Sequence, residues 1–466
     1  MLDVAVDPQP RQRRMTVHGM MSMNAMSRPR AVFRQLPLPT HSILQSFVSS
    51  HKADVFKCQS LHSNTFLTPP YACSYSHTAK KGGIPLLAVA TEQGAVHILN
   101  TSKRTDWDYE LQRTVLDIHQ NGVFDVQWSH SDELLATVSG DQSTRVTDLA
   151  TSKTLHILRN HTSTVKTVAW DPVNPNMLST GGRDGVICLW DMRAQGQRSS
   201  ESGIDVLTPV LRIPCAGGHV VKARRATTPT MKSVTSVLYL DGDPFGLTSS
   251  SSFDGILRHW DIRLPTSPHK GKSALRMIQP THVSSFDPTT VDGSRRPRGI
   301  ASLVAGAGPS AGLLFGLGTD SRIHTYIASA LLALPSTEMN SFAHSSMQTN
   351  SFYVRLALSP NGRWLLSGSA SRTGSAFLFD VSCAGRTRPI LSGSRSIPSQ
   401  GVEIKGQTGE VGAVDWAEGM VATCADDGTV RIWRDDRDIA RMCEANADNA
   451  KWDWAWAVDG GQPSNA

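Results

Sequence analysis

A turn residue followed six positions later by an aromatic or apolar residue recurs along the chain, and carboxylates in such a set could act as acids or metal ligands. The clearest copy runs from Asp184 to Trp190. The other copies are Asp254 to Trp260, Asp427 to Trp433, Asp320 to Tyr326, Asp141 to Thr147, Gln93 to Leu99 and Thr373 to Phe379. Seven copies of one spacing indicate a repeated structural module more than a set of catalytic centres.

A histidine and a hydroxyl residue accompany the clearest copy. The Asp184 carboxylate can accept a hydrogen bond from the His161 imidazole, and Ser179 or Thr180 together with the Trp190 indole N–H can extend this network. Such side chains could also bind a metal or transfer a proton, but their repetition favours a structural role. The residues assigned to this blade network are His161, Asp184, Asp254, Asp427 and Trp433.

Two arginines follow a Trp-Asp pair at the same distance in consecutive copies of the repeat. The residues are Trp190, Asp191 and Arg193 in one copy, and Trp260, Asp261 and Arg263 in the next. A guanidinium group is a planar fork of donors that suits carboxylate or carbonyl groups of a partner. An arginine at this place could also cap carbonyls of its own strand, but its recurrence in two copies favours a docking rim.

Each copy of the spacing predicts two strands joined by a tight turn, preceded by a third strand with alternating residues. Around Asp184, small packed residues lead into the turn Arg183-Asp184-Gly185, and a β-branched and aromatic stretch follows up to Trp190. The alternating stretch 165–170 supplies the preceding strand. The pattern predicts an all-β fold, a seven-bladed propeller with four strands in each blade and almost no long helix.

Several segments interrupt or delimit the predicted blades. The polar and basic stretch 194–232 is expected to be a mobile loop. The uncharged run 299–318 is expected to form two buried strands around a loop rather than a membrane span. The first strand of the sixth copy is predicted over 352–360, and closure of the ring requires a strand from near 55–59 or from just after 438.

The chain ends outside the blades divide the sequence into three parts: 1–66, the propeller at 67–436, and a tail at 437–466. Residues 1–27 lack periodicity and are expected to be disordered, as is the tail. Residues 31–36 predict a short amphipathic helix. Thr40 then looks like the N-cap of a second helix, in which Ile43, Leu44, Phe47 and Val48 share one face.

Composition limits the class of protein. The chain has 466 residues, 39% hydrophobic and 18% charged, with a net charge of +6. Seven cysteines without a Cys-x-x-Cys pair argue against a disulfide framework and a metal site, and no signal peptide is expected. Basic runs at 11–14, 222–225 and 295–298 could bind phosphates, but they lack interleaved aromatic residues, so direct nucleic-acid binding is not expected.

These motifs resemble the WD-repeat substrate receptors of cullin-4 RING ubiquitin ligases, and most closely the denticleless family. The resemblance rests on 88–94, 122–128, 140–142, 180–185, 351–355, 358–360 and 367–369, and on the two Trp-Asp-x-Arg motifs. The family's long loop between the corresponding blades matches 194–232. Members commonly carry a long C-terminal extension, whereas this sequence stops about thirty residues after its last predicted blade.

The resemblance implies a non-catalytic nuclear receptor that needs no cofactor. Arg193 and Arg263 would contact the damaged-DNA-binding adaptor protein that bridges to the cullin-4 RING complex, beside the helical pieces at 28–48. Substrates would be degron proteins bound to PCNA, such as the replication licensing factor and cell-cycle regulators, ubiquitinated for proteasomal degradation in S phase and after DNA damage. They would meet loops on the opposite face: 117–122, 160–164, 344–351 and 407–410.

Two other classes of function compete with this interpretation. A WD-repeat chromatin or RNA-binding scaffold would share the fold, and the basic runs are its best support. An enzyme is not expected, because the sequence has no Gly-rich phosphate loop, no Gly-x-Ser-x-Gly elbow and no His or Cys cluster with metal-ligand spacing. No metal or membrane partner is expected either.

Overall fold

The computed structural model describes residues 40–61, 66–104, 113–198, 204–214, 216, 232–263, 278–291, 296–336, 340–386 and 399–459. These residues lie in one compact unit, 37–466. Their regular secondary structure is mostly β-strand, arranged in six sheets. The predictions for residues 1–39, including the helix at 31–36, fall outside the described residues.

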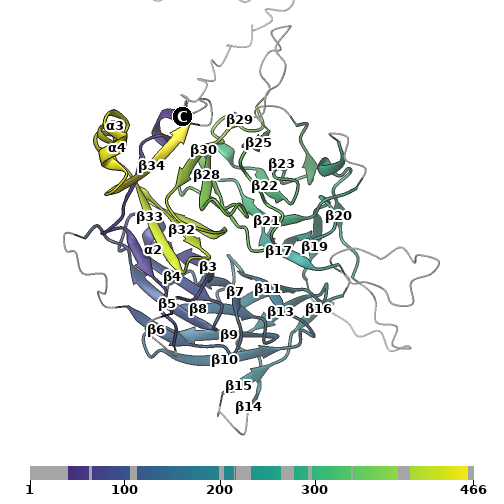
Figure 1. The fold of residues 1–466 in the computed structure, drawn as a ribbon. Coiled ribbons are helices and arrows are strands. Elements are labelled where there is room, and N and C mark those ends of the chain that lie inside the picture. Colours follow the sequence, from purple (N-terminus) through teal and green to yellow (C-terminus); the bar gives the residue numbers. More distant parts are fainter. Residues whose placement is uncertain are drawn as a thin grey trace, which may run out of the picture. The chain divides into compact units, whose positions relative to one another are not determined.

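The first four sheets along the chain share one plan, in which sequential strands lie next to one another in antiparallel order (Figure 1). The first contains β3 (Pro70–Tyr75), β4 (Leu86–Thr91), β5 (Ala95–Asn100) and β6 (Thr114–Asp117). The second contains β7 (Val123–Trp128), β8 (Leu134–Ser139), β9 (Ser143–Asp148) and β10 (Lys153–Arg159), with β15 (Asp205–Leu207) and β14 (Gln197–Arg198) added beyond β10. The third contains β11 (Val165–Trp170), β12 (Met177–Gly182), β13 (Ile187–Asp191) and β16 (Leu211–Ile213). The fourth contains β17 (Val234–Tyr239), β18 (Gly246–Ser251), β19 (Arg258–Asp261) and β20 (His282–Val283).

The remaining two sheets depart from this plan. The fifth contains β21 (Ile300–Ala305), β22 (Leu313–Gly318), β23 (Ile323–Ile327), β24 (Leu332–Ala333), β25 (Ser341–Ala343) and β29 (Ser399–Gln400). A ten-stranded sheet contains β26 (Leu356–Leu358), β27 (Trp364–Ser367), β28 (Ser375–Asp380), β30 (Val402–Lys405), β34 (Trp454–Asp459), β1 (Phe47–Ser50), β33 (Thr429–Asp435), β32 (Met420–Ala425) and β31 (Val411–Ala417), with β2 (Val55–Lys57) also on β33. The run 299–318 thus forms β21 and β22, as expected.

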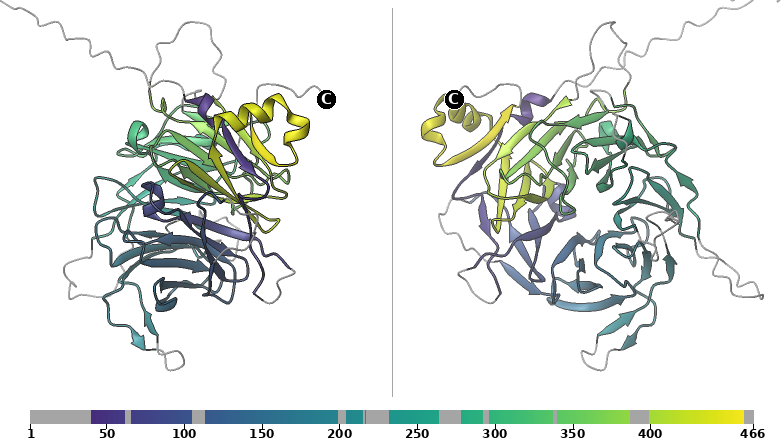
Figure 2. Two further views of the ribbon diagram at one scale, coloured as in Figure 1. Left: turned by 90° about the vertical axis from the view of Figure 1, so that its left-hand side faces the viewer. Right: turned by 45° about the vertical axis from the view of Figure 1, so that its right-hand side comes forward.

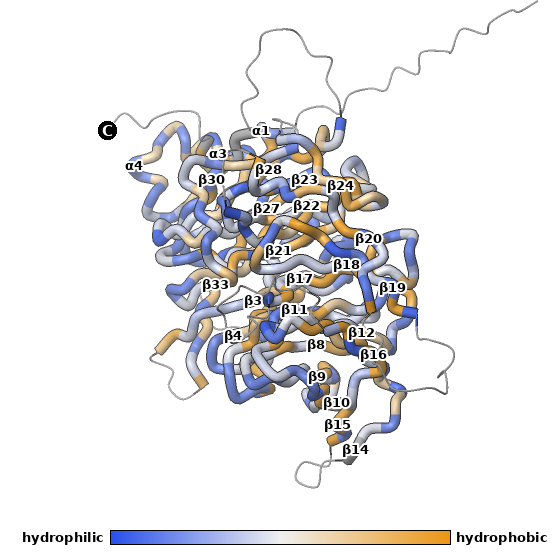
Figure 3. Tube along the Cα trace, turned by 90° about the vertical axis from the view of Figure 1, so that its right-hand side faces the viewer, coloured by the Kyte–Doolittle hydropathy of each residue, from blue (hydrophilic) through white to orange (hydrophobic). Residues whose placement is uncertain are grey.

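The first strands of the sheet units lie side by side in a closed ring. Each contacts the next in the order β3, β7, β11, β17, β21, β26 and β31, and β31 contacts β3 again. Hydrophobic stretches lie within the strands, and many connections are hydrophilic (Figure 3). This arrangement confirms an all-β propeller built mostly from strands.

Small residues let neighbouring sheets pack closely. Ser179, Thr180 and Gly181 of β12 are buried, as are the flanking apolar residues of this strand's sheet. A side chain at Gly181 would place its Cβ only 2.6 Å from Val234 of β17. The small residues that precede each predicted turn are therefore explained by contact between adjacent sheets.

Helices are short among the described residues. They are α1 (His41–Leu44), α2 (His77–Lys80), α3 (Arg437–Ala445) and α4 (Ala447–Ala450), with single 3-10 turns η1 (Pro288–Thr290) and η2 (Gly308–Ser310). None of them is long and apolar enough to cross a membrane.

The predicted second N-terminal helix is wrong beyond Leu44. Phe47 and Val48 lie in β1, which pairs antiparallel with β33 on one side and with β34 on the other. Thr40 does not cap α1 with its side chain. Its backbone N–H and hydroxyl instead donate to Asp380, at 2.8 and 2.9 Å, and the indole of Trp364 donates to its hydroxyl.

Strands from both ends of the chain complete the ring, whereas a strand from only one end was expected. The N-terminal β2 pairs with β33, as one alternative predicted, and the C-terminal β34 joins β1 to β30. The predicted propeller boundaries, 67–436, therefore leave out three strands. Residues 437–459, predicted as a disordered tail, form α3, α4 and β34 (yellow in Figure 2).

Two internal predictions also need correction. Described parts of the supposed mobile loop 194–232 form β14 (Gln197–Arg198), β15 (Asp205–Leu207) and β16. They are ordered because β15 pairs in parallel with β10, β16 pairs with β13, and Leu207 and Ile213 are buried. The first strand of the sixth copy is only Leu356–Leu358, so Phe352 and Tyr353 precede it.

Candidate functional site

The blade network around Asp184 is a directed chain of hydrogen bonds. The Trp190 indole donates to the Thr180 hydroxyl at 2.9 Å, and this hydroxyl lies 2.8 Å from His161 Nε2. His161 Nδ1 lies 3.1 Å from Asp184 Oδ2, so the carboxylate requires a proton on Nδ1. Thr180 therefore fills the hydroxyl position, while Ser179 bonds to the Tyr239 hydroxyl at 2.6 Å.

The Asp184 carboxylate also fixes the turn between β12 and β13. It accepts from the backbone N–H groups of Thr162, at 3.0 Å, and Val186, at 3.1 Å. Burial alone would raise the pKa of Asp184, but the hydrogen bonds from His161 and from the two N–H groups lower it below its ordinary value. This carboxylate is thus occupied by hydrogen bonds that hold the turn in place.

Asp184→Ala is expected to lower the free energy of unfolding by roughly 1–2 kcal/mol, because the buried His161 and two N–H groups lose their acceptor. Chemical denaturation monitored by tryptophan fluorescence measures this change. Asp117→Ala, at an exposed carboxylate of β6, is the matched control and should leave stability nearly unchanged. Equal stability of the two variants would contradict the structural role of Asp184.

The copy at Asp141 uses the same residue types: His119 Nδ1 lies 2.9 Å from the Asp141 carboxylate and His119 Nε2 lies 2.9 Å from the Thr137 hydroxyl. Two other copies form comparable networks with different residues. Asp427 accepts from the N–H groups of Thr408 and Thr429, each at 2.9 Å, and Trp433 donates to Thr423 at 3.0 Å. Gln407 takes the place of the histidine beside Thr423, at 2.7 Å. In the fourth sheet, the partners of Asp254 are Arg258, at 3.0 Å, and Ser251, at 2.8 Å, and Trp260 donates to Ser249.

Arg193 and Arg263 occupy matching positions on adjacent sheets. Each guanidinium forms a two-pronged ion pair with the aspartate two residues earlier, Asp191 or Asp261. The arginine side chains are 58% and 68% exposed. The ion pair lowers the pKa of Asp191 and of Asp261, chiefly through the hydrogen bonds from the arginine beside it. Two charge-paired arginines thus project from equivalent strand ends.

Strand direction places these arginines on the face opposite the predicted substrate loops. β13 begins after the turn at Asp184 and ends at Asp191, just before Arg193. Loop 160–164 bonds to the turn through Thr162, and loop 407–410 bonds to the corresponding turn through Thr408. A five-residue strand spans roughly 16 Å, which separates the two faces. We call them the loop face and the arginine face.

The described residues at 40–48 do not accompany the two arginines. They pack against β28, β33 and β34, whereas the arginines follow β13 and β19 on the other side of the ring in Figure 1. Figure 3 likewise shows α1 beside β28. The expectation that this segment lies next to Arg193 and Arg263 is wrong for residues 40–48.

A cavity of about 590 Å³ lies beside Arg263, between the fourth and fifth sheets. Phe245 lines it, is 51% exposed, and has its ring centroid 5.8 Å from the Arg263 guanidinium carbon. His259 also lines it and contacts Asp243 at 3.1 Å. The arginine face therefore offers a partly apolar recess next to one of its arginines.

Sequence reasoning missed an aromatic cluster on the loop face. The rings of Tyr71, Phe124, Phe352 and Tyr353 contact one another, although Tyr71 and Phe124 lie in different sheets and the other two precede a strand of a third sheet. One feature of the sequence could have indicated this cluster: Tyr71 and Phe124 are both the second residue of the first strand in their sheets. Below this cluster, the channel holds Arg355, which donates to the carbonyls of Phe124 and Lys166.

The described residues offer no cluster of His, Cys, Asp or Glu side chains that could hold a metal ion. The six cysteines among them are free thiols: Cys58, Cys73, Cys188, Cys383, Cys424 and Cys443. Burial raises the pKa of Cys58 and of Cys188 to about 12, so these thiols remain protonated at neutral pH. The basic runs 11–14 and 222–225 fall outside the described residues.

The chain is similar to known proteins both in its repeats and over most of its length. The family model for the WD domain, G-beta repeat, matches residues 110–148, 152–191, 341–380 and 399–434. Denticleless protein homolog A of Xenopus laevis is 28% identical over 459 residues, which cover 94% of this chain and 58% of that protein. Cell division cycle protein cdt2 of Schizosaccharomyces pombe is 30% identical over 362 residues, 75% of this chain and 66% of that protein.

The human denticleless protein homolog is 27% identical over 389 residues, which cover 80% of this chain and 47% of that protein. The chain thus spans between about half and two thirds of the length of these relatives.

The repeat boundaries explain how the ring holds together. The match at 152–191 begins with β10, the outer strand of the second sheet, and continues through β11, β12 and β13 of the third. Each such repeat therefore donates one strand to its neighbour. This overlap ties consecutive sheets together without a long connecting element.

Proposed function

Because this chain belongs to the denticleless family of WD-repeat proteins, we propose that it is the substrate-recognition adaptor of a cullin-4 RING E3 ubiquitin ligase. Its substrates would be degron proteins bound to PCNA, including the replication licensing factor and cell-cycle regulators. It would work in the nucleus, in S phase and after DNA damage, and would carry no catalytic group of its own.

One observation carries the proposal: the paired geometry of Arg193 and Arg263. Both arginines are exposed, both are held by an aspartate two residues earlier, and both project from adjacent sheets on the arginine face. A preformed Asp-Arg pair keeps the guanidinium in place, so little side-chain freedom is lost when a partner carbonyl or carboxylate binds. We assign this face to the damaged-DNA-binding adaptor protein, with Trp190 and Trp260 supporting it from the core.

We also propose that the ring comprises seven blades. This count treats the ten-stranded sheet as two blades, one starting with β26 and the other with β31, joined through β34 and β1. This count is supported by the contacts of the two first strands: β26 lies next to β21, and β31 lies next to β3, so each half of the sheet occupies a separate position in the ring.

The double variant Arg193→Ala/Arg263→Ala is expected to weaken adaptor binding by roughly tenfold or more, because two charged contacts on one rim are lost. Its melting temperature should be nearly unchanged, since both side chains are exposed. Affinity purification from cells, with quantification of the adaptor protein and of cullin-4, measures the effect.

The matched control is Arg183→Ala/Arg372→Ala, which removes two exposed arginines from turns on the loop face. It should recover the adaptor as well as the wild type does. Full recovery by the Arg193/Arg263 variant would refute the proposed docking rim. Absence of both adaptor and cullin-4 from the wild-type purification would refute the ligase role itself.

A further inference from the structure

Four aromatic side chains form a continuous surface at the mouth of the central channel on the loop face. Tyr353 lies at its centre, with ring centroids 4.5 Å from Tyr71, 4.1 Å from Phe352 and 5.9 Å from Phe124. The Phe124 and Tyr353 rings are nearly parallel, at 12°. Phe352 is 50% exposed. We call these four residues the aromatic platform.

Backbone irregularities place these rings at the mouth. The register of β3 shifts between Pro70 and Ala72, and that of β7 shifts between Val123 and Asp125. Tyr71 and Phe124 are therefore the extra residues of β-bulges, which redirect a side chain out of the regular pleat. In β31 the corresponding residue is Gly412, where an added Cβ would lie 3.3 Å from the Cβ of Tyr353.

Gly412 thus leaves the space that Tyr353 uses to reach across the seam towards Tyr71. Bulky bulge residues on β3 and β7, and a glycine on β31, create a surface that no single segment of the chain contains. Phe352 is exposed and the other three rings are half-buried, and a partly exposed aromatic surface of this kind usually marks an interaction site.

Carboxylates flank the Tyr71 end of the platform. The Tyr71 hydroxyl interacts with the Glu92 carboxylate and with the Tyr353 hydroxyl. Burial and the nearby Asp426 raise the pKa of Glu410, although Ser351 donates a hydrogen bond to it. Burial, together with the negative charges of Asp427 and Glu92, also raises the pKa of Asp426. Burial is the larger cause that raises the pKa of the Tyr353 hydroxyl, and Glu92, Glu410 and Asp426 all lie close enough to raise it further. Negative charge is therefore concentrated beside the tyrosine rings, on a protein whose net charge is +6.

The platform already holds one cation at its other end. The Lys166 Nζ lies 4.2 Å from the centroid of the Phe352 ring. Burial, Arg355 and Arg183 lower the pKa of Lys166 to about 8. Lysine lies over this ring despite the two neighbouring arginines, which fits the attraction of a cation to an aromatic face. No such internal cation covers Tyr71 or Tyr353 among the described residues.

We propose that the Tyr71 and Tyr353 end of the aromatic platform binds a lysine or arginine side chain from an extended peptide of a protein partner. The ring faces would receive the cation, and Glu92, Glu410 and Asp426 would supply the opposite charge. Charge complementarity selects this occupant, because an anionic peptide would meet three carboxylates here. The partner's identity as a ligase substrate rests on the proposed function, but the chemistry of the site does not.

The test uses two fluorescein-labelled peptides, one of alternating glycine and arginine and one of alternating glycine and glutamate, titrated by fluorescence anisotropy. The arginine peptide should bind the wild type more tightly than the glutamate peptide does. Tyr353→Ala should weaken its binding by roughly tenfold, and Glu92→Gln and Glu410→Gln should each weaken it severalfold. Glu92 is exposed, so its variant separates a binding loss from a folding defect.

Phe253→Ala is the matched control. Phe253 is 51% exposed and lies under Lys232, at 3.9 Å, in the turn between β18 and β19, away from Glu92 and Glu410. The Phe253→Ala variant should bind the arginine peptide as tightly as the wild type does. Equal binding by all platform variants, or preference for the glutamate peptide, would overturn the proposal. Recovery of the adaptor protein is measured in a separate experiment. A negative peptide result would therefore not contradict the proposed function, and loss of the adaptor would not contradict the peptide site.

Discussion

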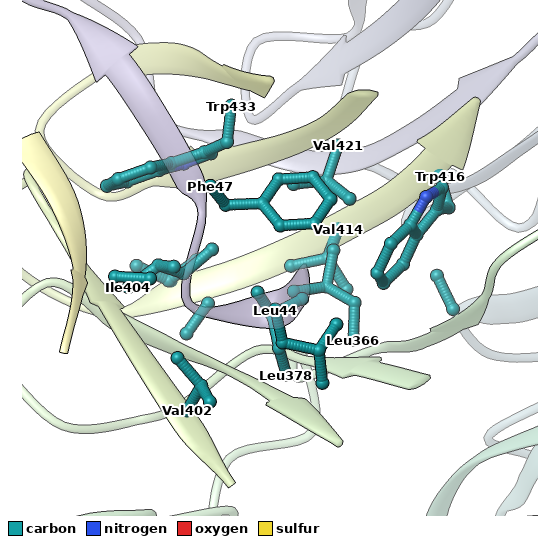
Figure 4. Close-up of a cluster of buried hydrophobic side chains, with 14 of the residues drawn as sticks. Leu44, Phe47, Leu366, Leu378, Val402, Ile404, Val414, Trp416, Val421 and Trp433 are labelled. Carbon is teal, nitrogen blue, oxygen red and sulfur yellow. The ribbon is translucent and has the colours of Figure 1, made fainter. Parts of the chain in front are cut away.

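Phe47→Ala is expected to lower the free energy of unfolding by about 3–5 kcal/mol, the usual cost of truncating a fully buried phenylalanine. The Phe47 side chain is 1% exposed and meets the Trp416 ring edge-on at 5.7 Å. It packs among Leu44, Trp433 and their neighbours, where the two halves of the ten-stranded sheet meet (Figure 4). Removing the ring leaves a cavity at the point where the N-terminal strand closes the ring.

Chemical denaturation with tryptophan fluorescence measures this loss, because Trp416 and Trp433 lie in the same cluster. The matched control is Phe66→Ala, since Phe66 is 69% exposed and should change stability little. If the two variants unfolded at the same denaturant concentration, β1 would not be an integral strand of the ring.

Acidification from pH 7.5 to 4.5 is expected to destabilise the protein, with His97 alone contributing about 2–3 kcal/mol. His97 lies in β5, is 1% exposed, and has no hydrogen-bond partner for either ring nitrogen among the described residues. Burial, and secondarily the positive charge of Arg113, lower its pKa from 6.5 to about 4.

The loss of stability on acidification follows from the number of protons that the folded and unfolded states bind. Between pH 6.5 and 4, the unfolded chain binds a proton at His97 that the folded protein excludes. The stability is therefore fully present above pH 6.5 and is lost as the pH falls towards 4. His97→Leu removes this titration, so its free energy of unfolding should fall less than that of the wild type over the same range.

Denaturant titrations at pH 7.5, 6.0 and 4.5 measure how steeply the free energy of unfolding changes with pH in the wild type and in His97→Leu. The control variant is His282→Leu, at an exposed histidine in β20, which should keep the wild-type dependence on pH. Parallel pH profiles for the wild type and His97→Leu would show that His97 titrates equally in both states of the chain.

The blade network could be predicted from the sequence, whereas the aromatic platform could not. The network joins His161, Thr180 and Asp184, which lie close in sequence and recur with regular spacing, so residue types and intervals were enough to suggest it. The platform joins Tyr71 to Tyr353, which lie far apart in the sequence. No local pattern connects two residues so far apart.

Local sequence patterns were enough to predict the repeated three-strand unit, its turns, and the placement of Arg193 and Arg263 at equivalent strand ends. These features depend on alternation, turn propensity and spacing, which act over a few residues. The tertiary structure alone decided that Phe47 and Val48 form a strand, because Ile43, Leu44, Phe47 and Val48 fit a helical spacing equally well. Their pairing with β33 and β34 supplies backbone hydrogen bonds and a buried face that only distant parts of the chain provide.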